Sequence, residues 1–582
     1  MIATRLLKQL LGNTVICAVG AILAFAGQSP AVWALGGAES MDRPSAKTLP
    51  EPAYPNDKPE QSFELPKLPE SEATDKANDR QLFIKHIRLQ GNQAITTEQL
   101  TPLLQPYLDR NVFLYEIEDL RQKLSRYYVD KGYINSGAVI TADAYRNGEL
   151  QIKLIEGRLD EVRVKGLEGL RAGYVINRLK RDDEAAFNVL ELQENFQMLL
   201  KDPLISRMNG RILPGERLGQ SILAVDVTRA KPYQLSFFGN NQRPPSIGGE
   251  AFGLTGQVWN LTGWGDSVDF TFINSEGSQR YAGGFSLPIS DSGTQFFFHF
   301  DEGDSVIVEA PINELDIQSQ VHSLEGGVSY PFIRGLKTNL TAGVSLAVRE
   351  NETFLSGVPS SFVPGEPTGR NQATVWRIFH DFLHYWDNHA LALRSSFSVG
   401  MDAFGATKER SVLKQSQVIS SEYPDSEFFA WLGQAQYAWR FLDNGSQFLL
   451  RSNIQLSDEP LLPLEQIAIG GMHTVRGYRE NQLVRDQGFS VSAEFRIPLL
   501  QSGRQQLQLI PFMDYGEAWN HVPQSGEQAG NALHSVGIGF EWRYQPVLVE
   551  FYYGHALLTP QNKQSKDIQD DGIHFQARWD VF

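Results

Sequence analysis

The chain has 582 residues, of which 21% are charged and 11% aromatic, and its 68 acidic and 52 basic residues give a net charge of −16. This composition is that of a folded chain with room for several domains. The negative charge argues against a nucleic-acid-binding protein, because phosphate contacts need clustered Lys and Arg. The mean hydropathy of −0.29 excludes a helical membrane protein. It is compatible with a membrane β-barrel, in which only every second strand residue faces lipid.

Residues 1–34 have the pattern of an export signal. Arg5 and Lys8 precede an apolar run at 15–25, and the tripeptides at 24–26 and 32–34 suit a signal peptidase. A membrane anchor or a buried helix is the alternative, which the shortness of the apolar run disfavours. Cys17 is the only cysteine. Because it would be removed with the signal, we expect a mature chain without disulfides or thiol ligands.

Residues 35–80 form the next region, in which seven prolines occur between Pro44 and Pro69 among Glu, Lys and Ser. Proline fixes φ and removes the backbone amide donor. The region is therefore predicted to be an extended linker without a core of its own.

Residues 81–230 contain two copies of one pattern. In the first copy, residues 81–158, Thr96 and Gln99 have the spacing of a helix capping box. Its predicted elements are a strand at 83–89, a helix beginning near 96, a helix at 117–131 and strands at 137–143 and 149–156. The second copy, residues 159–230, is predicted to have a strand near 162–164, helices at 174–180 and 189–201 and strands at 208–213 and 221–228. This β-α-α-β-β order predicts two small α+β domains.

From residue 231 to the C-terminus the apolar residues recur with a period of two. In the clearest case Val536, Ile538, Phe540 and Trp542 alternate with polar or small residues, which predicts a strand with one apolar face. Sixteen such segments occur, with the length that a tilted strand needs to cross a bilayer. They are 233–242, 250–260, 265–274, 279–288, 294–302, 319–331, 337–349, 372–381, 389–400, 428–440, 446–456, 487–498, 506–516, 532–543, 547–556 and 570–582.

The connections between these segments support an all-β, antiparallel, 16-stranded transmembrane barrel. Short turns alternate with connections that include four long ones, at 303–318, 350–371, 401–427 and 457–486. Outer-membrane barrels have short periplasmic turns and longer external loops. With both termini in the periplasm, 457–486 is an external loop. The alternative, a soluble all-β repeat protein, would not need an even number of strands with two sorted loop lengths.

Two short motifs carry a family resemblance. The external loop contains Val475, Arg476, Gly477 and Tyr478, and the strand 506–516 contains Phe512, Asp514 and Gly516. With both motifs in this order, the chain resembles the two-partner secretion transporters (the TpsB family), of the hemolysin and filamentous-haemagglutinin secretion and activation type. The resemblance identifies the two α+β units as POTRA domains. It also implies that loop 457–486 folds back into the lumen of a barrel spanning 231–582.

The resemblance implies an outer-membrane translocator with its N-terminal domains in the periplasm. Such a protein recognises an unfolded, secreted partner exoprotein and threads it through its barrel to the cell surface. One alternative is a barrel-assembly insertase, which usually has more POTRA domains. The other is a passive porin-like channel, which does not need periplasmic peptide-binding modules. The expected partners are a hemolysin- or haemagglutinin-like cargo and outer-membrane lipid, without nucleic acid, and the barrel is expected to be monomeric.

Strand parity indicates which residues face the lumen. On the strand 487–498 the polar set Ser490, Ser492, Glu494 and Arg496 should face inward, opposite to an apolar set. On the next strand Phe512, Asp514 and Gly516 share the inward face.

These positions predict how the two motifs meet. Asp514 offers a carboxylate with which the planar guanidinium of Arg476 can form a two-pronged pair. Phe512 is expected to be an apolar floor, Gly516 to leave space for an approaching backbone, and Tyr478 to lie beside the guanidinium. Arg479 and Glu480 are expected to form a solvated pair.

Motifs for catalysis are absent from the sequence. It has no Gly-x-Ser-x-Gly elbow, P-loop, His-Glu-x-x-His or paired-Cys motif. His380 and His384 have the spacing of a helical metal site, but they lie on or beside a predicted strand, which favours two separate side chains. We therefore expect no enzymatic activity, no cofactor and no metal.

Overall fold

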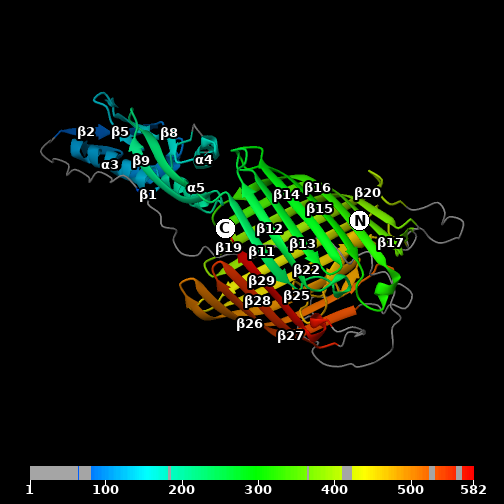
Figure 1. Cartoon of the computed structure of the whole chain (residues 1–582). Helices are drawn as coiled ribbons and strands as arrows, with labels where there is room; N and C mark the ends of the chain where they lie inside the picture. The colour runs from blue at the N-terminus through cyan, green and yellow to red at the C-terminus, as the bar shows by residue number, and fades with distance from the viewer. Residues whose placement is uncertain are drawn as a thin grey trace.

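The computed structural model describes residues 63–64, 80–180, 185–363, 366, 368–408, 423–522, 531–558 and 567–581. The predicted signal segment 1–34, and all of the predicted linker except 63–64 and 80, lie outside these residues. An α+β region, residues 80–229, lies at one end of a closed barrel (Figure 1). We call this region the N-terminal arm. Within the described ranges, no helix has the length and apolar character needed to cross a membrane.

The first unit of the arm has a small sheet in which β7 is central. β7 pairs in parallel with β3 and antiparallel with β5 and β6, and α3 buries Leu120 and Leu124 against this sheet. The predicted capping box is present, since the backbone amide of Thr96 donates to Gln99 Oε1. The elements are β2 (Gln81–Ile84), β3 (His86–Gln90), α2 (Thr97–Leu104), η2 (Gln105–Tyr107), β4 (Arg110–Phe113), α3 (Leu114–Asp130), β5 (Gly137–Val139), β6 (Tyr145–Arg146) and β7 (Glu149–Ile155).

The second unit of the arm has the predicted β-α-α-β-β order and its own apolar core. Its sheet has the strand order β1-β9-β10-β8, in which β1 is a two-residue segment from the proline-rich region. β1 runs parallel to β9, with Phe63 beside Gly210 and Glu64 beside Arg211. The elements are β1 (Phe63–Glu64), β8 (Arg158–Lys165), α4 (Ala172–Leu179), α5 (Val189–Leu200), β9 (Ile205–Pro214) and β10 (Gln220–Arg229).

Direct hydrogen bonds join the two units of the arm. The amide of Val189, at the start of α5, donates to the carbonyl oxygen of Gly132 at 2.9 Å, just beyond the end of α3. Asn135 Nδ2 donates to the carbonyl oxygen of Gly219 at 3.0 Å. The end of α3 therefore rests on the second unit.

The barrel agrees with the sequence prediction strand by strand. In the described residues sixteen long antiparallel strands form a ring that closes between β11 and β29, and the two-residue β18 (Val358–Pro359) only extends a hairpin on β17. Each predicted segment overlaps one long strand, so the predicted fold class is confirmed. The strands are β11 (Tyr233–Asn240), β12 (Ala251–Trp259), β13 (Ser267–Ser275), β14 (Ser278–Pro288), β15 (Gln295–Val306), β16 (Ile317–Arg334), β17 (Thr338–Leu355), β19 (Arg370–Tyr385), β20 (His389–Met401), β21 (Phe429–Arg440), β22 (Gln447–Ser457), β25 (Gln487–Ser502), β26 (Gln505–Trp519), β27 (Asn531–Tyr544), β28 (Val547–Ala556) and β29 (Ile573–Asp580).

Side-chain burial follows the predicted parity. Ser490, Ser492, Glu494 and Arg496 on β25 are buried inside the barrel, whereas Phe495 and, on β26, Met513 are exposed on the outer face. Short elements occupy the connections. They are η3 (Pro245–Ile247), η4 (Ile312–Leu315), η7 (Pro463–Glu465), β23 (Ile467–Ile469), β24 (Leu483–Arg485) and η8 (Ile568–Asp571).

The second unit of the arm rests on short turns of the barrel. The amide of Arg171 donates to the carbonyl oxygen of Gly263 at 3.0 Å, and the Arg171 guanidinium lies 3.8 Å from the centre of the Trp264 ring. On a second turn the amide of Leu336 donates to Glu194 Oε1 at 3.3 Å. These contacts orient the arm relative to the barrel.

Replacement of Trp264 by alanine should loosen this docking without unfolding either part. The lost cation–π contact is worth about 0.5 to 1 kcal/mol at a partly exposed site. Distances between spin labels on α5 and on the barrel should therefore spread over a wider range. Leu261→Ala is the matched control, since Leu261 lies on the same turn with its side chain exposed. Equal distance distributions for Trp264→Ala and the unmodified chain would show that the ring does not hold the arm.

Candidate functional site: the loop anchor inside the barrel

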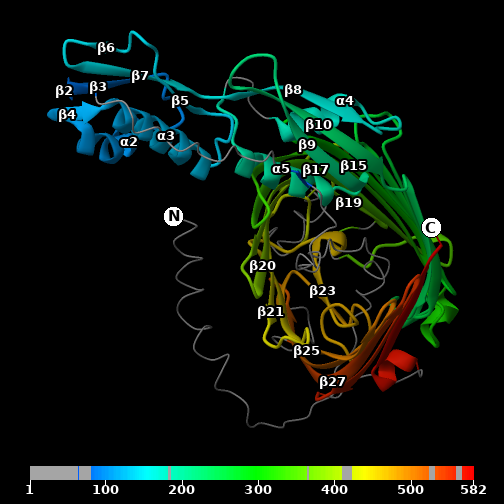
Figure 2. The ribbon, with the colours of Figure 1, turned by 90° about the vertical axis from the view of Figure 1, so that its left-hand side faces the viewer.

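Loop 457–486 enters the barrel as a short hairpin. β23 and β24 pair with each other rather than with the wall, and Figure 2 shows β23 within the ring of barrel strands. Ile469 and Val475 on this loop pack against Gly516 of β26. A Cβ atom at Gly516 would lie 2.5 Å from Ile469 Cγ2 and 2.8 Å from Val475 Cγ2. Gly516 thus makes room for side chains of the loop, and not for its backbone as expected.

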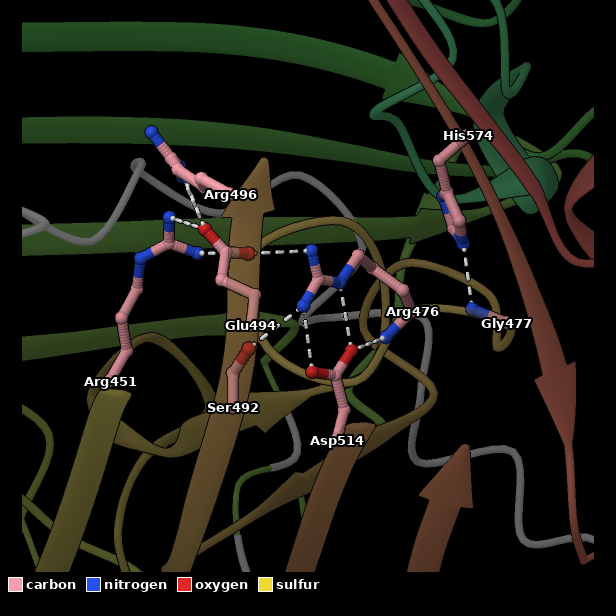
Figure 3. Close-up of polar contacts among 8 residues, drawn as sticks. All are labelled: Arg451, Arg476, Gly477, Ser492, Glu494, Arg496, Asp514 and His574. Carbon is pink, nitrogen blue, oxygen red and sulfur yellow. Dashed lines mark hydrogen bonds and ion pairs between the residues drawn. The ribbon is translucent and has the colours of Figure 1, made fainter. Parts of the chain in front are cut away.

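Arg476 is the centre of the contact between the loop and the wall (Figure 3). Its Nε and Nη2 each lie 2.8 Å from an oxygen of Asp514, and its backbone amide donates to the same carboxylate at 3.0 Å. Nη2 also donates to Ser492 Oγ at 2.8 Å, and Nη1 donates to Glu494 Oε2 at 2.9 Å. Arg476, Asp514 and Glu494 are all 2% exposed or less. The pair therefore lies in a buried pocket, where bonds to a charged group are strong.

Glu494 connects Arg476 to two further arginines of the wall. Its Oε1 accepts from Arg451 Nη2 of β22 at 2.9 Å and from Arg496 Nε of β25 at 2.8 Å. Parity placed Glu494 in the lumen but did not identify it as a partner of Arg476. Across the β25–β26 pair, Ser492 lies beside Asp514 and Glu494 lies beside Phe512. Parity gives the face of each residue but not this register, so it could not show that Glu494 reaches Arg476.

Two aromatic rings flank the Arg476 guanidinium. Its Cζ lies 3.7 Å from the centre of the Phe512 ring and 5.1 Å from that of Tyr552 on β28. Phe512 is thus a cation–π partner as well as an apolar floor. Tyr552 was not among the residues singled out from the sequence.

Gly477 brings the loop backbone against the wall. Its φ is +92°, and a Cβ atom there would lie 2.7 Å from the carbonyl oxygen of Gly554 on β28. The Gly477 amide donates to His574 Nε2 of β29 at 3.1 Å. Two glycines facing each other therefore allow the close backbone contact.

Tyr478 lies elsewhere than the sequence interpretation placed it. It packs with Ile469, Val475 and Leu483, and its hydroxyl is 2.9 Å from the carbonyl oxygen of His534 and 3.0 Å from that of Leu558. A buried Tyr hydroxyl needs such a partner. Tyr478 thus ties the loop to the outer ends of β27 and β28.

The expectation of a solvated Arg479–Glu480 pair is wrong. Arg479 Nε lies 2.6 Å from Asp570 Oδ1, and its Nη1 lies 2.9 Å from Glu309 Oε1. Glu480 Oε1 instead accepts from the amide of Met472 at 2.7 Å. Arg479 therefore connects the loop to the β15–β16 and β28–β29 connections, two partners far away in the sequence.

The histidines considered as metal ligands have separate surroundings. His384 Nδ1 lies 2.7 Å from Thr338 Oγ1, and the His380 ring contacts Phe397 edge-on. Within the described ranges, no cluster of His, Cys, Asp and Glu has the form of a metal site.

Comparisons with known proteins agree with the barrel and the arm. Residues 219–542 match the family model described as haemolysin secretion/activation protein ShlB/FhaC/HecB, and residues 82–157 match a POTRA domain of ShlB type. The heme/hemopexin transporter protein HuxB of Haemophilus influenzae strain 86-028NP is 22% identical over 470 residues, covering 78% of this chain and 79% of that protein.

Two solved structures share the fold. CdiB from Escherichia coli has a TM-score of 0.67 at 19% identity and covers 88% of this chain and 93% of that one. CdiB from Acinetobacter baumannii has a TM-score of 0.60 at 16% identity, with 91% and 94% covered. Because the family model matches more than half of the chain, the insertase and porin alternatives fall away. The chain belongs to the ShlB/FhaC/HecB haemolysin secretion/activation family: it is a TpsB transporter of the outer membrane, not an enzyme, and it secretes partner exoproteins.

Proposed function

We propose that the chain captures an unfolded, hemolysin- or haemagglutinin-like exoprotein on its N-terminal arm and threads it in extended form through a monomeric barrel. Residues 81–158 and 159–230 act as two POTRA domains. The Arg476 anchor holds loop 457–486 across the lumen at rest, and the loop moves aside during transport. No nucleotide is needed, because folding of the cargo outside the cell drives its movement.

The observation that carries this proposal is the pairing of β1 with β9. A strand at the edge of a sheet has unpaired amides and carbonyls to which an extended chain can add. The β9 edge accepts two residues of this same chain, at Gly210 and Arg211. An edge that binds one extended segment is suited to bind a cargo segment in the same manner, since the backbone bonds do not depend on sequence.

A photo-crosslinking experiment tests capture at this edge. A photoreactive residue at Leu213, which is exposed on β9, should cross-link to the secreted partner during export by the full-length transporter. The matched control is Leu218, an exposed side chain in the turn after β9. It should give little product, because it lies beyond the strand edge. Equal cross-linking at both positions, or none at Leu213, would contradict strand addition at β9 and leave the arm as a spacer.

A further inference from the structure

We define the base of loop 457–486 as residues 461–466 together with Asp486. The base contacts a part of the wall away from the Arg476 anchor. Glu465 on η7 lies between two inward-facing arginines. Its carboxylate oxygens lie 2.6 and 2.8 Å from Arg377 Nη2 of β19, and Arg349 Nη1 of β17 lies 3.4 Å from Oε1. Arg349 Nη1 also donates to the carbonyl oxygen of Leu464 at 3.2 Å. Three strands, β20, β21 and β22, separate this site from the Arg476 anchor on β25 and β26.

The two ends of the loop are tied to each other at the base. Asp486 Oδ1 accepts from the amide of Leu461 and from Gln466 Nε2, both at 2.9 Å. Gln455 Nε2 on β22 donates to the carbonyl oxygens of Glu465 at 2.9 Å and Asp486 at 3.1 Å. The outer segment, residues 467–485, starts beyond these bonds. Since β23 and β24 pair within it, the outer segment begins as a stiff hairpin.

The base is also buried against the barrel. Leu461 and Leu462 pack in one apolar cluster with wall residues of β19 and β21 and with the external connections. Leu461 forms a parallel bridge with Asp425. The segment beside Asp425 is fixed to β20, because the amide of Gly400 donates to the carbonyl oxygen of Phe428 at 2.8 Å. The base is thus continuous with the wall.

The two contacts of the loop with the wall, at the Arg476 anchor and at the base, differ in the charges that lose a partner when the contact opens. If Arg476 leaves, Glu494 keeps Arg451 and Arg496 as partners, and the Asp514 carboxylate is the one charge that loses its ion-pair partner. The other contact behaves differently.

If Glu465 leaves the base, the guanidiniums of both Arg349 and Arg377 lose their ion-pair partner. Two positive charges inside the barrel then lose a partner, compared with one negative charge at the Arg476 anchor. A buried charge without a partner is costly, so the Arg476 anchor is the contact that opens more readily.

We propose that Arg349 and Arg377 form a carboxylate seat that keeps the base fixed during transport, so that only the outer segment swings when the Arg476 anchor opens. The seat is a positioning site for the loop and does not itself touch the cargo. This inference rests on the proposed function for its premise that the loop moves.

Thiol accessibility distinguishes a fixed base from a loop that leaves as a whole. Single probes, Leu461→Cys in the base and Ile469→Cys in the outer segment, start from side chains that are 1% and 0% exposed. In a Cys17→Ala background each probe is the only thiol. Arg476→Ala should make the Ile469 probe reactive to maleimide in the membrane-embedded protein, while the Leu461 probe stays protected. Glu465→Gln and Arg377→Gln should expose the Leu461 probe.

Arg394→Gln is the matched control for these variants. Arg394 Nε lies 2.6 Å from Asp381 Oδ1, a pair that joins β20 to β19. This change should leave both probes protected. In Arg476→Ala, equal reactivity of the Leu461 and Ile469 probes would overturn the inference. The base would then leave the wall together with the outer segment. Heat modifiability on a gel checks that each barrel is folded.

Export of the partner protein supplies the second test. Asp425→Cys with Leu461→Cys places two thiols on bridged residues, and the disulfide fixes the base to the wall. Export should be the same with this bond formed or reduced. A loss on oxidation that reduction reverses would refute the fixed base. Protection of both probes during active export would instead contradict the proposed loop movement, so the two hypotheses fail separately.

Discussion

Replacing Arg476 by alanine should nearly abolish export while leaving a heat-modifiable barrel in the outer membrane. The change strands the Asp514 carboxylate in a pocket where it is 1% exposed, and breaking a buried pair in this way costs about 3 to 5 kcal/mol. Since about 1.4 kcal/mol is a factor of ten, the docked loop loses at least roughly a hundredfold in population. The proposed transport needs a loop that docks at rest and moves aside with the cargo, and a loop that cannot dock cannot follow this cycle.

Substitution of Asp514, the partner of Arg476, should reduce export less than Arg476→Ala does. In Asp514→Ala the guanidinium still has Glu494 and Ser492, so we expect a smaller loss of export. The double variant should be no worse than Arg476→Ala alone, because neither charge is then stranded. Secreted partner protein in the medium, measured relative to barrel in the membrane, gives the comparison. Normal export by both single variants would exclude the pair as part of the transport mechanism.

Gly477→Ala should block docking of the loop although the side chain adds one carbon. The new Cβ would lie 2.7 Å from the carbonyl oxygen of Gly554 at a φ of +92°, and both β28 and the loop backbone are held at this point. We expect export to fall nearly as far as in Arg476→Ala, and an Ile469→Cys probe to become reactive.

The control for Gly477→Ala separates steric contact from backbone strain. Gly357 has a φ of +74°, but a Cβ atom there meets nothing within 4 Å. Gly357→Ala should carry only the strain of a left-handed alanine, about 1 to 2 kcal/mol, and should export normally. Equal losses in the two variants would attribute the effect to strain and not to the contact with β28.

The sequence predicts a strand well where one of its faces is apolar. The prediction misses strand residues where neither face is apolar. The sixteen segments were recognisable because every second side chain meets lipid. β17 nevertheless extends past its predicted end at residue 349 to Leu355, since strands beyond the bilayer no longer need an apolar face. β4, with only Arg110 to Phe113 before α3, has too few residues to show a period.

The candidate site was only partly predictable for a different reason. Parity placed Asp514 and Glu494 in the lumen, but contacts across strands depend on register, and the β25–β26 register shifts at a bulge between Pro498 and Leu500. The partners of Glu465, Arg349 and Arg377, lie 88 residues or more away in the chain. No spacing rule connects them, because only closure of the barrel brings them together.

The docking of the arm has a consequence for how transport begins. Contacts through Arg171 and Glu194 fix the second unit on the barrel turns, so a cargo segment on β9 is already tethered near the pore. The next step is then intramolecular, and its rate depends on an effective local concentration and not on the cargo concentration in the periplasm. Because this step is intramolecular, a weak individual contact between the cargo and the arm suffices. Fast dissociation of that contact then lets the extended chain advance.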